Sequence, residues 1–208
     1  MIHTLLTTAR SGSTWYGYVM AEKYNADFLG EIFHIEHMDE HKQNLLHTMK
    51  TFLGPEKNCV IKVFAQHLMY NKIANLQETI LNNSHHVEIL VRKSFNDQVK
   101  SLYIANEYEK LKNPNALVSQ EPTYQDNFSE PFIINSIDMI AFDFIVDRIK
   151  SELIYLSKLY HNYNFKLSYL EDIKDQYKDY NVKIGKLNRP VVWNAELPTI
   201  DFDTASLF

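Results

Sequence analysis

Residues 2–15, with the sequence IHTLLTTARSGSTW, decide the fold of this chain. Residues 2–9 form a short β-prone run, and from Ser13 to about Tyr24 the spacing becomes helical, with Trp15, Val19 and Met20 on one face. A polar turn that contains Gly12 separates the two patterns. A strand, a tight polar turn and a helix in this order predict the first unit of an α/β protein.

The same alternation continues along the chain. Residues 59–64 (CVIKVF) are an almost continuous apolar run, which is typical of a strand covered on both faces, and residues 87–91 and 165–170 predict further strands. Helices are expected at residues 36–52, 71–81, 94–111 and 133–163, and a short extended segment at residues 27–33. For the last helix we expect one buried stripe of apolar residues, formed by Ile137, Ile140, Phe144, Ile145, Ile149 and Leu153.

These elements predict an α/β fold: a single-domain, three-layer structure over residues 1–208 with a mostly parallel sheet flanked by helices. Residues 113–131, which hold three prolines, are expected to be irregular, as is the tail from about residue 180.

Composition excludes several classes of protein. Hydrophobic residues make up 45% of the 208 residues and charged residues 23%, so a disordered chain is excluded. One cysteine, Cys59, rules out an internal disulfide framework, and we expect a buried thiol in a strand. The net charge of −5 argues against a nucleic-acid partner. No membrane span or basic signal region is evident, so we expect a cytoplasmic protein with no membrane partner.

Arginine is scarce and its positions are informative. The chain has seventeen lysines but four arginines, and both Arg10 and Arg92 follow predicted strands. Ligands of parallel α/β sheets bind beyond the carboxyl ends of the strands. The guanidinium fork suits bidentate binding of anions. Both residues are therefore candidates for anion binding.

The segment Arg10-Ser11-Gly12-Ser13-Thr14-Trp15 has the composition of an anion-binding turn. A glycine lets the backbone approach a ligand, and the start of the next helix offers free N–H groups. Hydroxyls and the guanidinium complete a site for one phosphate or sulfate group. The nucleotide-triphosphate pattern G-x-x-x-x-G-K-[ST] is absent, and an ordinary polar turn that caps a helix remains the alternative.

This segment resembles the 5′-phosphosulfate loop of sulfotransferases that use 3′-phosphoadenosine 5′-phosphosulfate (PAPS). Residues 92–101 (RKSFNDQVKS) resemble the 3′-phosphate motif of the same family, with the spacing of the bacterial trehalose-sulfotransferase-like branch. Residues 167–173 (LSYLEDI) are similar to a late "Y-E-D-L" segment, whereas the C-terminal R-K-G-x-x-G-x-W loop is not present. The resemblance implies a P-loop-like sulfotransferase fold with PAPS as cofactor and 3′-phosphoadenosine 5′-phosphate (PAP) as product. It implies that the cofactor is bound by Arg10, Ser11, Gly12, Ser13, Thr14, Trp15, Arg92 and Ser101.

Transfer of a sulfuryl group needs an acceptor for the proton of the attacking hydroxyl. Three residues near predicted strand ends are candidates: Glu31, which is similar to a glutamate of the trehalose-like branch, then His67 and His34. Lys62 stands inside an apolar strand, where it either reaches the anion or occupies an edge open to water.

No metal is expected, because His37 and His41 offer only an H-x-x-x-H spacing without the context of a zinc site. The leading hypothesis is a sulfotransferase that moves the sulfuryl group of PAPS to a hydroxyl or amine of a small molecule or carbohydrate. The alternatives are a non-catalytic nucleotide-binding protein on the same scaffold and a nucleotide kinase or hydrolase. The oligomeric state is left open.

Overall fold

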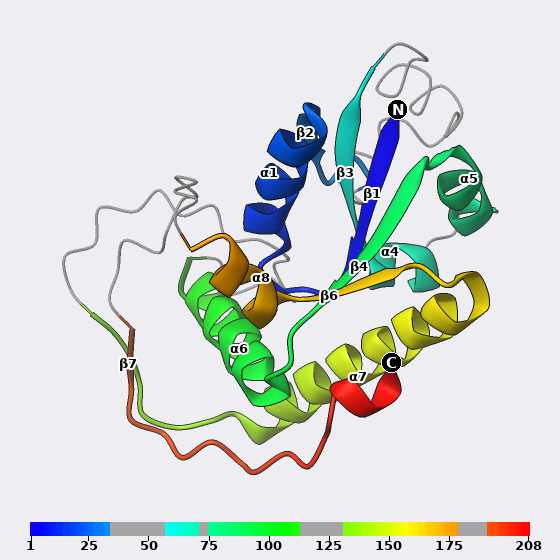
Figure 1. Ribbon diagram of the computed structural model, residues 1–208. Helices are drawn as coiled ribbons and strands as arrows, with labels where there is room; N and C mark the ends of the chain where they lie inside the picture. Colours follow the sequence, from blue (N-terminus) through cyan, green and yellow to red (C-terminus); the bar gives the residue numbers. More distant parts are fainter. Residues whose placement is uncertain (34–56, 71–74, 113–130, 179–190) are drawn as a thin grey trace.

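The computed structural model describes residues 1–33, 57–70, 75–112, 131–178 and 191–208 (Figure 1). Its centre is a five-stranded sheet in the order β2-β3-β1-β4-β6, in which every neighbouring pair is parallel. A separate two-stranded parallel sheet joins β5 to β7. The strands are β1 Ile2–Thr7, β2 Asp27–Gly30, β3 Cys59–Phe64, β4 His86–Val91, β5 Phe132–Ile134, β6 Lys166–Tyr169 and β7 Val191–Trp193. The helices are α1 Ser13–Tyr24, α4 Ala65–Tyr70, α5 Leu76–Asn83, α6 Phe95–Lys112, α7 Met139–Tyr163 and α8 Leu170–Gln176, followed by the 3₁₀ turn η1 Ala205–Leu207.

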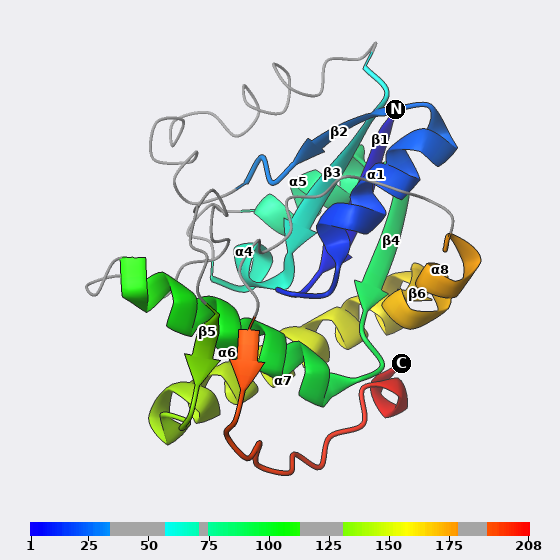
Figure 2. The same cartoon turned by 90° about the vertical axis from the view of Figure 1, so that its left-hand side faces the viewer.

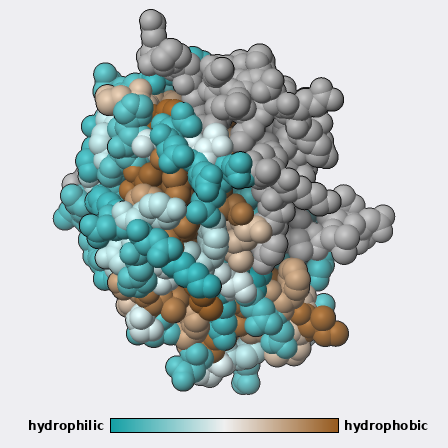
Figure 3. All heavy atoms as spheres, turned by 90° about the vertical axis from the view of Figure 1, so that its right-hand side faces the viewer, coloured by the Kyte–Doolittle hydropathy of each residue, from teal (hydrophilic) through white to brown (hydrophobic). Residues whose placement is uncertain are grey.

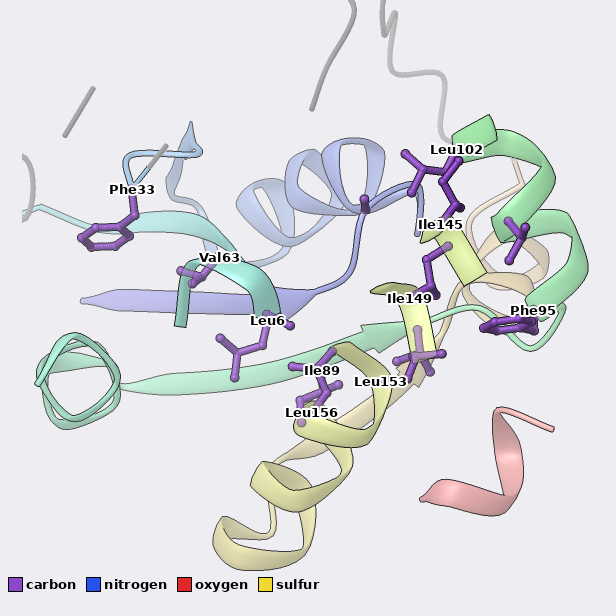
Figure 4. Close-up of a cluster of buried hydrophobic side chains, with 14 of the residues drawn as sticks. Leu6, Phe33, Val63, Ile89, Phe95, Leu102, Ile145, Ile149, Leu153 and Leu156 are labelled. Carbon is purple, nitrogen blue, oxygen red and sulfur yellow. The ribbon is translucent and has the colours of Figure 1, made fainter. Parts of the chain in front are cut away.

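Helices cover both faces of the sheet. Since successive side chains of a strand point to opposite faces, neighbouring residues of one strand pack against different helices. On one face Leu5 and Leu90 join a cluster with residues of α1 and α8. On the other face Leu6 and Ile89 contact the helices α5, α6 and α7, and the close-up of this core shows Leu153 and Leu156 of α7 directed at the sheet (Figures 2 and 4). The predicted three-layer α/β architecture with a mostly parallel sheet is therefore confirmed.

Several predicted elements agree with the structure. The strand expected at residues 59–64 has those bounds, and Cys59 is buried in it as expected. The helix expected at residues 94–111 is α6, and Ser94 caps it by accepting a hydrogen bond from the Asp97 amide at 3.3 Å. The helix expected at residues 36–52 and most of the loop at residues 113–131 lie outside the described residues.

The long helix differs from its prediction. Its first two expected residues belong to β5, and the helix begins only at Met139, where the Asp138 carboxylate accepts the amides of Ile140 and Ala141 at 3.1 and 3.2 Å. Ile140 and Phe144 are 85% and 60% exposed, so the prediction that they are buried is wrong. With the start of the helix moved, the apolar residues of the buried face include Phe142, Ile145, Ile149, Leu153 and Leu156.

Two further predictions need correction. The helix expected at residues 71–81 is represented by α5, which ends at Asn83, and a separate helix, α4, follows β3 directly. The tail expected to be irregular contains β7 and η1. It packs on the core, since the ring centroids of Phe202 and Phe95 lie 4.6 Å apart with their planes tilted by 48°, and the Ser157 hydroxyl donates to the Leu207 carbonyl at 2.5 Å.

The order of the strands places the site. From the central strand β1 the chain proceeds to β2 and β3 on one side, and then to β4 and β6 on the other. The direction of winding thus changes between β1 and β4, and ligands of open α/β sheets bind beyond the strand ends at such a switch point. The turns that follow β1 and β4 meet there.

On the described part of the face in Figure 3, hydrophobic side chains occur in separate small areas among hydrophilic ones.

Candidate functional site

The turn after β1 has an unusual backbone. Arg10 and Gly12 both have positive φ values, 59° and 79°, on either side of Ser11. Ser11 is fully buried, and its hydroxyl is hydrogen-bonded to that of Thr7, which in turn donates to the Leu90 carbonyl of β4 at 3.0 Å. We call this turn, residues 8–14, the anion loop, after the anion site that the sequence predicts there. Its polar groups connect it to the neighbouring strand rather than leaving it as an open turn.

Gly12 is required for two reasons. Its φ of 79° and ψ of 14° lie in the left-handed region, which disfavours residues with a side chain. A Cβ atom at this position would also stand 2.6 Å from a methyl carbon of Leu170, the first residue of α8. The glycine therefore lets α8 pack directly against the anion loop.

Helix α1 begins at Ser13, and Gly12 provides no side-chain cap. The first amides of a helix have no partner within the helix, so those at the start of α1 are suited to an anion. Ser13 is buried, and Trp15 is half-buried against the cluster around Tyr16, so the sequence-predicted loop residues fold into one continuous turn.

The two predicted anion motifs are joined by a hydrogen bond. Nε of Arg10 donates to the hydroxyl of Ser101 on α6 at 3.1 Å. One turn earlier on α6, the buried Gln98 amide donates to the Ala9 carbonyl at 2.6 Å and to the Thr8 hydroxyl at 2.5 Å. Residues 92–101 therefore lie beside the anion loop, as two turns on adjacent strands should.

Lys62 connects the predicted base to the anion loop. Its ammonium lies 2.7 Å from the carboxylate of Glu31 and 2.9 Å from the hydroxyl of Thr14. Lys62 is buried on β3, between β1 and β2, so the alternative of an edge position open to water is excluded. A buried lysine and a carboxylate that is 10% exposed form a charged group at the carboxyl end of the sheet.

Arg92 follows β4 at the same edge of the sheet. Its Nε lies 3.8 Å from a carboxylate oxygen of Glu171, and its Nη2 lies 3.9 Å from Asp97. These separations exceed hydrogen-bond length, and the buried Nε makes no hydrogen bond to the part of the chain that the structure describes. Glu171 instead accepts the amides of Lys93 and Ser94 at 2.9 and 3.4 Å, so the segment with the "Y-E-D-L" resemblance supports the turn that carries Arg92.

The other base candidates are placed differently. His67 is buried on α4, and its ring centroid lies 5.4 Å from that of Phe64. His34 lies outside the described residues, as do His37 and His41. Among the residues described, no group of three or more histidine, cysteine, aspartate or glutamate side chains could hold a metal ion. Glu31 is the candidate that the structure connects to the anion loop.

Sequence reasoning missed a buried ion pair in α7. Glu152 is fully buried and accepts a hydrogen bond from Nε of Arg148 at 2.9 Å, and the Arg148 guanidinium also donates to the side-chain carbonyl of Gln66 on α4. In the sequence, an arginine and a glutamate four residues apart on a helix are typical of an exposed ion pair. The usable signal was that Glu152 falls between Ile149 and Leu153, two members of the predicted buried stripe.

Comparison with known proteins adds no assignment. We found no match to a family model, to a curated protein or to a solved structure. Within the described ranges, no helix is long and apolar enough to cross a membrane.

Proposed function

We propose that this protein is a PAPS-dependent sulfotransferase that transfers a sulfuryl group to a hydroxyl or amine of a small molecule or carbohydrate. One observation carries the proposal: the hydrogen bond from Arg10 to Ser101 joins the two anion motifs at the switch point of the sheet. Two separate phosphate turns on adjacent strands suit a nucleotide with phosphates on both sides of its ribose. A single phosphate ligand would need only one of them.

The charges at this edge fit such a nucleotide. Arg10, Lys62 and Arg92 all lie near the carboxyl ends of β1, β3 and β4. The positive φ values at Arg10 and Gly12 and the uncapped start of α1 add backbone donors for the 5′ side. On the 3′ side, Arg92 is separated from its acidic neighbours by more than a hydrogen-bond length, so its guanidinium can turn to a phosphate.

PAPS, when bound, supplies a sulfur atom with a phosphate leaving group. The acceptor oxygen forms a bond to that sulfur while the bond from sulfur to the bridging oxygen breaks, which releases PAP. Glu31 accepts the proton of the acceptor hydroxyl, and the positive charge of Lys62, between Glu31 and Thr14, stabilises the negative charge that develops. The protein groups proposed for this step are in contact, since Lys62 lies 2.7 Å from Glu31 and 2.9 Å from Thr14.

The test has a binding step and a transfer step. Calorimetry should show tighter binding of PAP than of AMP or of ATP with Mg²⁺; preferred binding of ATP with Mg²⁺ would instead support a kinase or hydrolase. Single-turnover assays with radiolabelled PAPS and a panel of sugars, phenols and amines then identify the acceptor. Binding of PAP without transfer to any of them would favour the non-catalytic alternative.

The Glu31→Gln variant tests the proton acceptor. The amide has nearly the same shape and keeps an oxygen that can accept a hydrogen bond from Lys62, so the variant should fold, although with lower stability because the buried ammonium loses the charge of its carboxylate. In the folded variant PAP should still bind, while the rate of transfer should fall by roughly 10²–10⁴, the usual contribution of a general base. His67→Asn is the matched control, and its rate should stay near that of the unmodified protein. If His67→Asn loses the rate and Glu31→Gln keeps it, the proton acceptor is His67.

A further inference from the structure

Gln98 is a buried side chain that links the two anion motifs and that the proposed reaction does not use. It lies in the first turn of α6, within the motif that begins at Arg92, with an exposed fraction of 0%. Its side-chain nitrogen donates to the carbonyl of Ala9 at 2.6 Å and to the hydroxyl of Thr8. Its side-chain oxygen has no hydrogen-bond partner among the described residues. The hydrogen bonds of this amide group are therefore made to the anion loop.

The orientation of the Gln98 amide is defined by its partners. If its nitrogen and oxygen were exchanged, the side-chain oxygen would face the carbonyl oxygen of Ala9, and two acceptors would repel each other. A buried acceptor without a donor costs free energy, and an apolar side chain of similar size would avoid this cost. The two bonds to the loop, rather than the stability of the core, account for an amide at this position.

The bond to Ala9 controls the backbone of Arg10. The carbonyl of Ala9 and the N–H of Arg10 belong to one planar peptide group, so a bond to one end fixes the direction of the other. Rotation of this plane would change the φ of Arg10, which is 59° and lies in a region that residues with a side chain rarely adopt. We therefore expect this peptide to rotate when Gln98 does not hold it.

The backbone of Gln98 is joined to the turn that carries Arg92. Its backbone amide donates to the carbonyl of Ser94 at 3.2 Å, at the start of α6. A group that binds at Arg92 therefore acts on the same helical turn from which the Gln98 side chain reaches the anion loop. One residue connects the start of α6 to the peptide between residues 9 and 10.

We propose that Gln98 is a positioning residue that couples the two anion sites: a 3′-phosphate bound beside Arg92 stabilises the anion loop in the conformation that binds the 5′-phosphate side. The choice of ligands rests on the proposed function. A coupling of this kind is reciprocal, so each phosphate strengthens the binding of the other. PAP, which carries both phosphates, binds more tightly than their separate contributions would give.

The experiment measures hydrogen exchange of residues 9–14 in the full chain, without ligand and with saturating adenosine 3′-monophosphate. This nucleotide has no 5′-phosphate, so when its phosphate lies at Arg92 it can slow exchange in the loop only through the protein. Arg92→Ala tests that placement, because slowing that persists in this variant would mean that the phosphate occupies the loop itself. Calorimetry with PAP accompanies each exchange measurement.

Gln98→Met is the test variant, since methionine is of similar length, fills irregular space and cannot donate a hydrogen bond. Asn106→Met is the matched control. Asn106 lies about two turns later on α6, is 8% exposed, and its side-chain oxygen also lacks a partner among the described residues. The control therefore replaces a buried amide of the same helix that does not contact the anion loop through a hydrogen bond.

In the unmodified protein, adenosine 3′-monophosphate should slow exchange of the loop amides by about 3- to 10-fold, the worth of one hydrogen bond. In Gln98→Met the loop should exchange faster without ligand, the nucleotide should no longer slow it, and the affinity for PAP should fall by about 3- to 10-fold. Asn106→Met should behave as the unmodified protein in all three measurements.

Three results would overturn the proposal: no slowing in the unmodified protein, slowing that persists in Gln98→Met, or slowing that persists in Arg92→Ala. If Gln98→Met does not fold, Gln98→Asn replaces it, because this amide is one methylene group shorter and does not reach both acceptors. Unaltered exchange and unaltered slowing in Gln98→Asn would then overturn the proposal.

Failure of the proposed function gives a different result. In that case the unmodified protein binds neither PAP nor adenosine 3′-monophosphate, and the coupling is refuted with the function. Exchange without ligand in Gln98→Met still decides whether Gln98 holds the loop. If PAP binds but the coupling is absent, the proposed function stands and the inference alone is wrong.

Discussion

Arg92→Ala should distinguish PAP from AMP, because the two nucleotides differ only by the 3′-phosphate that Arg92 is proposed to bind. In the free protein the guanidinium lies 3.8 Å from Glu171 and 3.9 Å from Asp97, so its removal breaks no hydrogen bond to these carboxylates. Glu171 still accepts the amides of Lys93 and Ser94 in the variant, which keeps the turn in place. The free energy of unfolding should therefore change by less than about 1 kcal/mol.

The loss on binding follows from the charge-assisted contact. One such hydrogen bond contributes about 1.5–3 kcal/mol, and about 1.4 kcal/mol is a factor of ten in affinity. PAP should bind about 10- to 140-fold more weakly to the variant. The affinity for AMP should change by less than about threefold, since no contact is lost and only a distant charge is removed.

The assay is titration calorimetry with both nucleotides at one fixed ionic strength, together with urea unfolding of each protein. Lys93→Ala is the matched control, because it removes the same charge one residue away, where the ammonium pairs with Asp172 at 2.5 Å. Equal losses of PAP and AMP in Arg92→Ala, or an equal loss of PAP in Lys93→Ala, would refute the assignment of Arg92 to the 3′-phosphate.

Two further predictions concern stability. Gly12→Ala should lower the free energy of unfolding by about 1–3 kcal/mol, because alanine is strained at a φ of 79° and its Cβ would stand 2.6 Å from Leu170. In urea unfolding, the Gly12→Ala/Leu170→Ala protein should lose less stability than the sum of the losses of the two single variants. Strictly additive losses would contradict the contact between the two residues. Burial alone would raise the pKa of Glu88, but hydrogen bonds from Lys166, Ser168 and Tyr16 outweigh this effect and hold the pKa below its usual value. The Glu88 carboxylate therefore stabilises the protein above about pH 4.5, and this contribution is lost as the pH falls through the lowered pKa. Glu88→Gln should therefore be less stable at pH 7 by about 1.5–3 kcal/mol, and the difference should shrink toward pH 3; a difference that is constant with pH would show that the charge is not responsible.

The fold was largely predictable because its strands are covered on both faces. Residues 59–64 are apolar almost throughout, so their assignment as a strand does not depend on an alternation of polar and apolar residues. The bounds of this strand in the structure are those expected from the sequence. The error in α7 has a local cause: apolar residues continue from β5 into the helix, so the sequence shows no break between them. The cap at Asp138 sets the start, and Ile140 and Phe144 then lie on the outer side.

The sequence identifies the residues of the candidate site but not the contacts between them. The sequence indicates Arg10 and Ser101 as members of two motifs, and the strand order brings them together. Nothing in either motif predicts that one donates a hydrogen bond to the other. The link from Glu31 through Lys62 to Thr14 likewise depends on β3 lying between β1 and β2, which no single segment determines.

The anion loop shows why a local sequence pattern does not determine the backbone geometry of a turn. A turn with two residues of positive φ is not the preferred conformation of its own sequence, since Arg10 gains nothing locally from a φ of 59°. The conformation is held by contacts from two other elements: the Leu90 carbonyl of β4, which accepts from the Thr7 hydroxyl that is bonded to Ser11, and the Gln98 amide of α6. Each of these contacts forms only after the sheet and its helices have assembled. A short segment that contains this motif should therefore not adopt the turn in isolation, and any affinity of the loop for anions should depend on the complete core.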